Sequence, residues 1–191
     1  MFFYGLLPDG DQQTRVALSE NGRSFTAAPP LLGPSYSRAF QWRGRWYSTH
    51  LWGEMGMFET LSTAPKIFPH RTLPLQITGA PNAKIRHGHI CQVGEHMNFV
   101  FSRVGDTPEC ILHCQIALFD DPQDWRFGPV TKLLTPDVTW EGFGRNPVKS
   151  AEVSARGWIP ELRDPCLFKD CLLYTSPSPR DLSTSRMPSS A

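Results

Sequence analysis

The sequence predicts an all-β fold made of repeated antiparallel sheets, and three observations support this. The 191 residues include 15 Gly and 18 Pro, and the apolar runs between these turn residues are short. No segment carries apolar residues at helical spacing over three turns. The chain also repeats itself: residues 86–94 (RHGHICQVG) and 163–170 (RDPCLFKD) both open on Arg and continue as an apolar strand. A repeated strand with ionisable residues at its start is typical of a β-propeller with a central site.

The repeat also aligns residues of different chemistry. Arg86 aligns with Arg163, His87 with Asp164, and Gly88 with Pro165. A further, looser copy comes first along the chain, at residues 37–44 (SRAFQWRG), and opens on Ser37 and Arg38.

The remaining elements follow from turn signals between short apolar runs. Residues 15–25 are interpreted as the last two strands of one blade, with a turn at Asn21-Gly22. Further blades are expected at residues 38–68, at residues 86–130, and from Leu162 onward. The blade at 86–130 is nearly whole, with strands expected at 89–92, 97–103, 110–118 and 125–127. Connections are expected at 33–34, 72–83 and 135–156, and the last is long enough to suggest a functional loop.

Residues 171–191 (CLLYTSPSPRDLSTSRMPSSA) differ from the rest of the chain. They are compatible with a disordered Ser/Pro tail. They resemble more closely the translation of a transposon-end sequencing adapter, which would make them non-native and exclude them from the fold. We therefore expect an incomplete propeller domain over residues 1–170 and a non-native, disordered tail over residues 171–191.

Charge and hydropathy exclude several classes of partner. The chain has 19 basic and 18 acidic residues, and no basic patch suggests nucleic acid. No apolar run approaches the ~18 residues that a membrane span requires. Residues 1–9 lack the basic start of a signal peptide, which favours a cytoplasmic location unless Met1 lies inside a longer chain.

Metal and cofactor sites are not expected. The spacing of the cysteines at 91, 110, 114 and 166 matches no zinc pattern, and they are interpreted as small thiols buried in strands. His87 and His89 alternate on one strand and so point the same way, but no third metal ligand accompanies them.

Several motifs resemble one family. Residues 19–25 (SENGRSF) are similar to the outer turn of five-bladed propellers, and residues 162–170 (LRDPCLFKD) to their Arg-Asp-Pro strand start. Residues 86–89, 104–109 and 140–142 resemble a bacterial branch of the same superfamily. The resemblance covers residues 1–170 and is to the glycoside hydrolases of the arabinanase, levansucrase and invertase group. It implies about three blades of a five-bladed β-propeller, and a carbohydrate-active enzyme that acts on a glycoside.

Glycoside cleavage requires two carboxyl groups with different pKa values. By resemblance, Asp164 occupies the position of the orienting aspartate, and Glu141 is similar to a segment that carries the general acid. Glu109 is a third candidate, and the base aspartate is expected upstream of Met1. The structural alternatives are an Arg163–Asp164 ion pair, a solvated Glu141, and a Glu109 that caps a turn or pairs with Arg103.

Substrate-binding residues are expected at the strand starts. Arg86 and Arg163 could hold an acidic sugar or keep Asp164 ionised. The other candidates for sugar contact are Arg38, His87, His89 and, by stacking, Trp140. The alternative function is a non-catalytic propeller that binds a glycan or a small anionic ligand. A protein-interaction propeller is a third possibility, for which no exposed apolar patch is evident.

Overall fold

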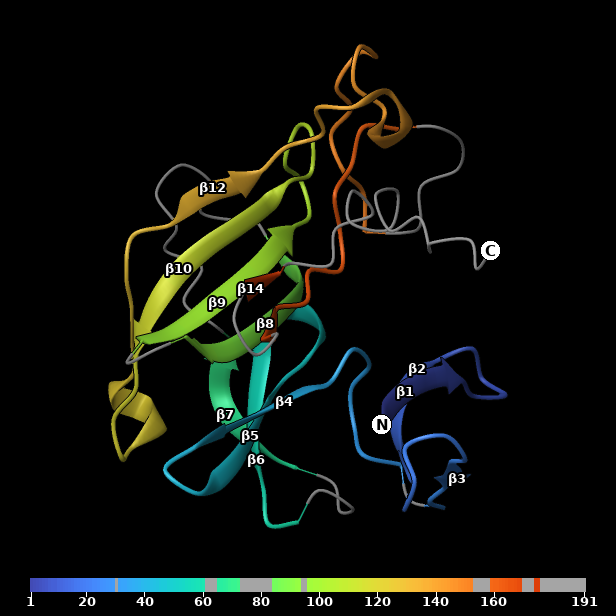
Figure 1. Cartoon of the computed structure of the whole chain (residues 1–191), viewed down its shortest axis with the longest axis vertical. Coiled ribbons are helices and arrows are strands. Elements are labelled where there is room, and N and C mark those ends of the chain that lie inside the picture. Colours follow the sequence, from blue (N-terminus) through green and yellow to red (C-terminus); the bar gives the residue numbers. More distant parts are fainter. Residues whose placement is uncertain are drawn as a thin grey trace, which may run out of the picture.

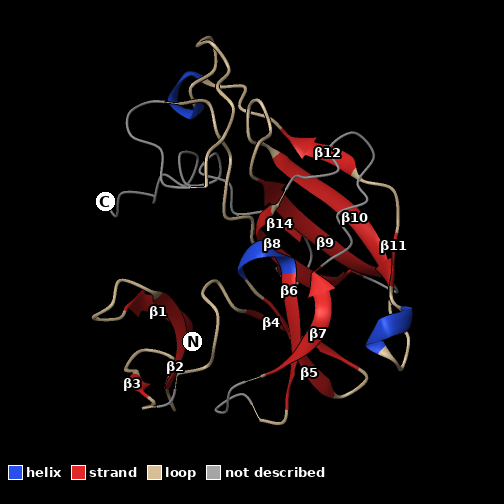
Figure 2. Ribbon diagram, turned by 180° about the vertical axis from the view of Figure 1, so that it is seen from behind, coloured by secondary structure: helices blue, strands red, loops and turns tan. Residues whose placement is uncertain are grey.

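The computed structural model describes residues 1–29, 31–60, 65–72, 84–93, 96–152, 159–169 and 174–175. These residues form an all-β protein of several antiparallel sheets, none of them closed into a barrel (Figures 1 and 2). Within the described residues there is no α-helix, only three single-turn 3-10 segments. The predicted all-β class is therefore confirmed.

The first sheet has three strands in the order β1-β2-β3, with bounds Phe2–Leu6, Gln12–Leu18 and Thr26–Ala27. The turn between β2 and β3 was predicted at Asn21-Gly22 and is confirmed. Asn21 Oδ1 accepts hydrogen bonds from Arg23 N at 2.8 Å and Ser24 N at 2.9 Å. Ser19 Oγ accepts one from Gly22 N at 2.9 Å. Such side-chain-to-backbone bonds explain why Ser and Asn occupy the turn. The strand β1 lies before the two strands that residues 15–25 were expected to form.

The second sheet is an antiparallel meander of four strands in the order β4-β5-β6-β7. Their bounds are Arg38–Trp42, Arg45–Thr49, Glu54–Phe58 and Lys66–Thr72, with the 3-10 turn η1 at Leu51–Gly53. This sheet matches the four-strand unit expected over residues 38–68. The connection expected at 72–83 lies, beyond Thr72, outside the described residues.

The third sheet begins with another meander, β8-β9-β10-β11, at Ile85–Val93, His96–Arg103, Ile111–Ala117 and Arg126–Phe127. The turn η2 covers Pro122–Asp124. The four expected strands are all present, within a few residues of their predicted bounds. A fifth strand, β12 at Thr131–Leu134, was not predicted. Both β11 and β12 pair with β10, β11 near its end at Ile116 and Ala117 and β12 near its start at residues 111–113.

The C-terminal part differs from expectation at one place. Phe168–Lys169 (β13) pair antiparallel with Tyr174–Thr175 (β14), so these two tail residues form a strand rather than disordered chain. The rest of the 171–191 tail lies outside the described residues. The long connection after β12 contains only the 3-10 turn η3 at Thr139–Glu141 and is otherwise irregular where it is described.

An aromatic core joins the second and third sheets. Trp125, 3% exposed, has its ring 6.2 Å from Phe40, 5.1 Å from Tyr47 and 6.4 Å from Trp42, all of the second sheet. Its indole nitrogen donates to Phe119 O at 2.8 Å, which satisfies the buried polar group. Trp125, directly before β11 of the third sheet, therefore packs against the second sheet.

A β-bulge in β8 shapes the start of that strand. Ile85 pairs with Arg103 and Gly88 with Phe101, so β8 carries one extra residue between these pairs. A Cβ on Gly88 would lie 2.4 Å from Phe99 Cε2, which explains why glycine ends the bulge. The bulge includes Arg86 and His87, two of the candidate site residues, and bulges commonly redirect side chains in this way.

All four cysteines are free thiols in the structure. Cys110 and Cys114 are buried as predicted, but Cys91 and Cys166 are only partly buried, and Cys110 and Cys166 lie just outside the strands. In the part of the chain that the structure describes, no helix has the length and apolar character to cross a membrane.

Candidate functional site

The openings of the three repeat copies come together in the structure. Arg38 begins β4, Arg86 and His87 lie at the start of β8, and Arg163 and Asp164 precede β13. The strand β8 contacts both β4 and η1, which brings the first two copies side by side. His87 then contacts Asp164 of the third copy. Among the described residues, the starts of these copies therefore lie close to one another.

A buried ion cluster forms the base of this region. Glu109 is 0% exposed. One of its carboxylate oxygens accepts a hydrogen bond from Arg86 Nε at 2.9 Å, and the other accepts one from Arg163 Nε at 3.1 Å. Arg86 also donates to the backbone oxygens of Ala151 and Glu152, and Arg163 contacts Glu161. The buried carboxylate therefore has a guanidinium partner from each of two repeat copies.

This cluster corrects three expectations. Glu109 is a structural counter-ion with no exposed oxygen, which argues against its prediction as a catalytic carboxyl. It pairs with Arg86 and Arg163 and not with Arg103, which instead binds Asp106 at 3.0 Å. Arg86 binds Glu109 and two backbone oxygens, and Arg163 binds Glu109 and Glu161, so the carboxylate that both arginines hold is Glu109 and neither Asp164 nor an acidic sugar.

Asp164 is the accessible carboxylate of the region. Its side chain is 53% exposed, and Oδ1 lies 2.7 Å from Nδ1 of the buried His87. The distance is short, but the Nδ1–H direction is not aligned with the oxygen. Partial burial acts to raise the pKa of Asp164, but contact with His87 and the charges of Arg38 and Arg163 outweigh it, so the pKa lies below its usual value. Asp164 is therefore ionised at neutral pH.

Two tyrosines that were not predicted from the sequence lie beside His87, Tyr36 in direct contact and Tyr4 behind it. The Tyr36 ring lies 3.9 Å from the His87 ring and 4.3 Å from the Tyr4 ring. Burial, the hydrogen bond with Tyr4 and nearby charges raise the pKa of Tyr36 far above its usual value, so its hydroxyl stays protonated. Tyr4 is 44% exposed. The one available signal was the position of Tyr36, directly before the Ser37-Arg38 repeat.

His89 has a structural role in the same region. Its Nδ1 accepts a hydrogen bond from Leu167 N at 2.9 Å, which ties β8 to the third repeat copy. Burial, together with the charge of Arg38, lowers the pKa of His89 to about 4. His87 and His89 thus contact the same segment, in line with their predicted common direction.

Glu141 and Trp140 lie in the separate η3 turn. Glu141 is 5% exposed and its Oε2 accepts from Asp137 N at 3.0 Å, which anchors the carboxylate in its own loop. The prediction of a solvated Glu141 is therefore wrong. Trp140 is 44% exposed. Gly142 holds this turn against Pro160, three residues before Arg163 opens the third repeat copy.

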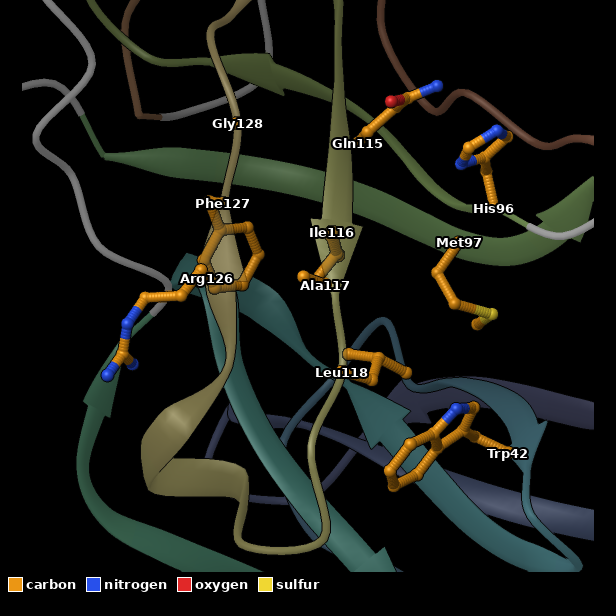
Figure 3. Close-up of a pocket in the computed structure, with 10 residues that line it drawn as sticks. All are labelled: Trp42, His96, Met97, Gln115, Ile116, Ala117, Leu118, Arg126, Phe127 and Gly128. Atoms are coloured by element: carbon orange, nitrogen blue, oxygen red, sulfur yellow. The ribbon is translucent and has the colours of Figure 1, made fainter.

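A cavity of about 510 Å³ opens elsewhere, between the outer strands of the third sheet and Trp42 (Figure 3). Leu118 and Trp42 point toward one another there, and the Arg126 guanidinium points away from both. None of the predicted site residues lines it. Across the described residues, no group of three or more His, Cys, Asp or Glu has a metal-binding arrangement.

Comparison with known proteins gives one relative of low identity. This chain is 24% identical, over 205 aligned residues, to a protein of Acanthamoeba polyphaga mimivirus whose name is "Uncharacterized protein R118". The alignment covers 98% of this chain and 57% of the viral protein. No protein-family profile matches the chain, and no solved structure matches it.

Proposed function

We propose that this chain is part of a β-propeller whose Asp164 cluster binds a carbohydrate in a glycoside-processing protein. Support for the propeller comes from two successive four-strand meanders, β4–β7 and β8–β11, that pack on each other through Trp125. Further support comes from the repeat, because its three copies each begin the first strand of a unit and meet at their starts.

The observation that carries the carbohydrate assignment is the environment of Asp164. The carboxylate is ionised, partly exposed and held beside His87, whose ring contacts that of Tyr36, which in turn contacts that of Tyr4. An ionised acceptor, neutral hydroxyl donors and aromatic rings are the groups that bind sugar hydroxyls and sugar faces. Position and charge both suit the orienting carboxylate that the Arg-Asp-Pro resemblance implies.

A second candidate, a propeller that binds a glycan without turnover, is favoured by a different observation. Glycosidases need a protonated carboxylic acid in addition to an ionised one. Glu109, one of the three predicted carboxyls, is buried and bound by two arginines, so it is out of reach of a glycosidic oxygen. Glu141 is therefore left as the predicted acid.

The test is a titration of the whole chain with arabino-oligosaccharides and fructo-oligosaccharides by calorimetry. We expect Asp164→Asn to weaken binding by about ten- to a hundredfold, the loss of a hydrogen bond to a charged group. The control Asp120→Asn removes an exposed aspartate that binds Arg43 at 2.6 Å, and should leave affinity unchanged. Release of nitrophenol from nitrophenyl glycosides separates the two candidates: turnover supports the enzyme, and binding without turnover supports the binding protein. A folded chain that binds none of these saccharides would refute both.

A further inference from the structure

The two ring nitrogens of His87 have different surroundings. Nδ1 is enclosed and lies 2.7 Å from Asp164 Oδ1. Among the described residues, no hydrogen-bond donor or acceptor meets Nε2. A histidine with one nitrogen on a carboxylate and the other unoccupied is the arrangement that lets the second nitrogen accept a proton.

Neighbouring groups favour one protonation pattern for this pair. The charges of Arg38 and Arg163, together with the contact to His87, hold Asp164 ionised, so the shared proton belongs on His87 Nδ1 and not on the carboxylate. Nε2 of the neutral ring then carries a lone pair. The 2.7 Å distance already suits a charge-assisted hydrogen bond, and imperfect alignment is common in catalytic pairs before a ligand binds.

Tyr36 restricts the orientation of the ring. Its own ring lies 3.9 Å from that of His87 at an interplanar angle of 38°. The side chain of His87 is also only 10% exposed. The contact with the Tyr36 ring and the burial of the side chain both limit rotation of the imidazole. A general base requires this kind of preorganisation.

We propose that His87 is a catalytic general base, that Asp164 is its positioning residue, and that the proton acceptor is Nε2. This inference rests on the proposed function, because the reacting group is the water that glycoside hydrolysis consumes. The proton of that water moves to Nε2 while its oxygen forms a bond to the anomeric carbon. The bond from that carbon to the leaving oxygen breaks, the leaving oxygen takes a proton from solvent, and the imidazolium returns its proton to solvent.

The tautomer of His87 tests the dyad without any activity. In a ¹⁵N-labelled chain, long-range ¹H–¹⁵N spectra should show neutral His87 with its proton on Nδ1, the signal being assigned by its loss in His87→Gln. Asp164→Asn should move the proton to Nε2, whereas Asp120→Asn should change nothing. A wild-type ring with its proton on Nε2, or a tautomer indifferent to Asp164→Asn, would overturn the proposal.

Kinetics then test the catalytic role. With nitrophenyl glycosides, whose leaving group needs little protonation, we expect His87→Gln to lower kcat by about 10²-fold or more with little change in KM. The acidic limb of the wild-type kcat/KM profile should be absent in His87→Gln. The titratable and charged groups around the ring are Asp164 and Tyr36, with Arg38 and Arg163 beside the carboxylate.

The two proposals fail in different ways. Full turnover in a folded His87→Gln chain would remove the general base but keep the glycoside function. An Nδ1–H tautomer in a chain that binds no saccharide would remove the proposed function but support the dyad. Because Asp164 is half exposed, Asp164→Asn serves as the second variant if His87→Gln does not fold.

Discussion

Arg86 and Arg163 bind the two oxygens of one buried carboxylate, Glu109. The two arginines occupy the same position in two copies of the repeat. Glu109 lies between β9 and β10, so a single side chain ties β8 to the segment that precedes β13. The next residues of the repeat, His87 and Asp164, also meet, at 2.7 Å. The bonds of Arg86 and Arg163 to Glu109 therefore hold the two repeat copies at the distance at which His87 and Asp164 meet.

The first prediction concerns the stability of this cluster. Glu109→Ala leaves Arg86 buried and without its carboxylate, and removing one partner of a buried pair typically costs about 3–5 kcal/mol. We expect a loss of that size in the free energy of unfolding, measured by urea denaturation. The exposed Glu20→Gln is the control and should stay within about 0.5 kcal/mol of wild type. A change below about 1 kcal/mol in Glu109→Ala would show that the cluster contributes little.

The positions of the charged groups were predictable from the sequence, but their partners were not. The alignment of repeat copies placed Arg86 with Arg163 and His87 with Asp164. It did not reveal that a turn residue 54 positions before Arg163 would lie between the arginines. Ion-pair choice depends on how separate sheets pack, and local pattern carries no information about that.

The strands were likewise predictable only in part. Alternating apolar runs and turn residues located the strands of the second and third sheets. The short strand β12, three of whose four residues are exposed, lacks an apolar pattern and was missed. Tyr4 and Tyr36 were missed because they come from different parts of the chain, and neither belongs to a motif.

A second prediction concerns acid sensitivity. His50 is 1% exposed and lies between Ser37 Oγ at 2.6 Å and Ser48 Oγ at 2.8 Å. Burial lowers its pKa to about 4. The unfolded chain therefore binds a proton that the folded chain does not between about pH 6.5 and pH 4, so stability falls as pH decreases through that window. One such histidine contributes a slope of about 1.4 kcal/mol per pH unit, and His89 adds a slope of the same sign.

The measurement is a series of urea denaturations from pH 7 to pH 4. Because the slope is compared, and not the absolute stability, His50→Asn is informative even if it destabilises the chain. We expect its slope to be shallower than that of wild type. His96 is exposed, so His96→Gln should keep the wild-type slope. Equal slopes in wild type and His50→Asn would mean that His50 is not held neutral.

The third prediction tests the close approach at the β8 bulge. A Cβ at position 88 would lie 2.4 Å from Cε2 and 2.6 Å from Cζ of Phe99. Phe99 is 1% exposed and stacked on Phe101 at 4.6 Å, so its ring has little room to move. We expect Gly88→Ala to destabilise the fold by about 1–3 kcal/mol, the usual cost of overpacking.

The control for this substitution is Gly5→Ala, where nothing lies within 4 Å of the added Cβ. The second-site change Phe99→Leu should make Gly88→Ala less costly, because it removes the atoms that clash. Additive effects of the two substitutions in a double-mutant cycle would contradict the proposed contact.

The fourth prediction compares two glycines in the loop that carries Glu141 and Trp140. Gly142 and Gly144 have φ angles of +90° and +86°, so alanine is strained at both positions. Only at Gly142 would the Cβ meet backbone, at 2.8 Å from Pro160 Cα, while nothing lies within 4 Å at Gly144. The backbone strain is therefore matched, and the clash with Pro160 is the difference between the two variants. We expect Gly142→Ala to raise amide hydrogen exchange over residues 139–145 well beyond the effect of Gly144→Ala. If the loop also contributes to the saccharide site, Gly142→Ala should weaken saccharide binding more than Gly144→Ala does. Equal exchange in the two variants would show that the contact with Pro160 does not hold the loop.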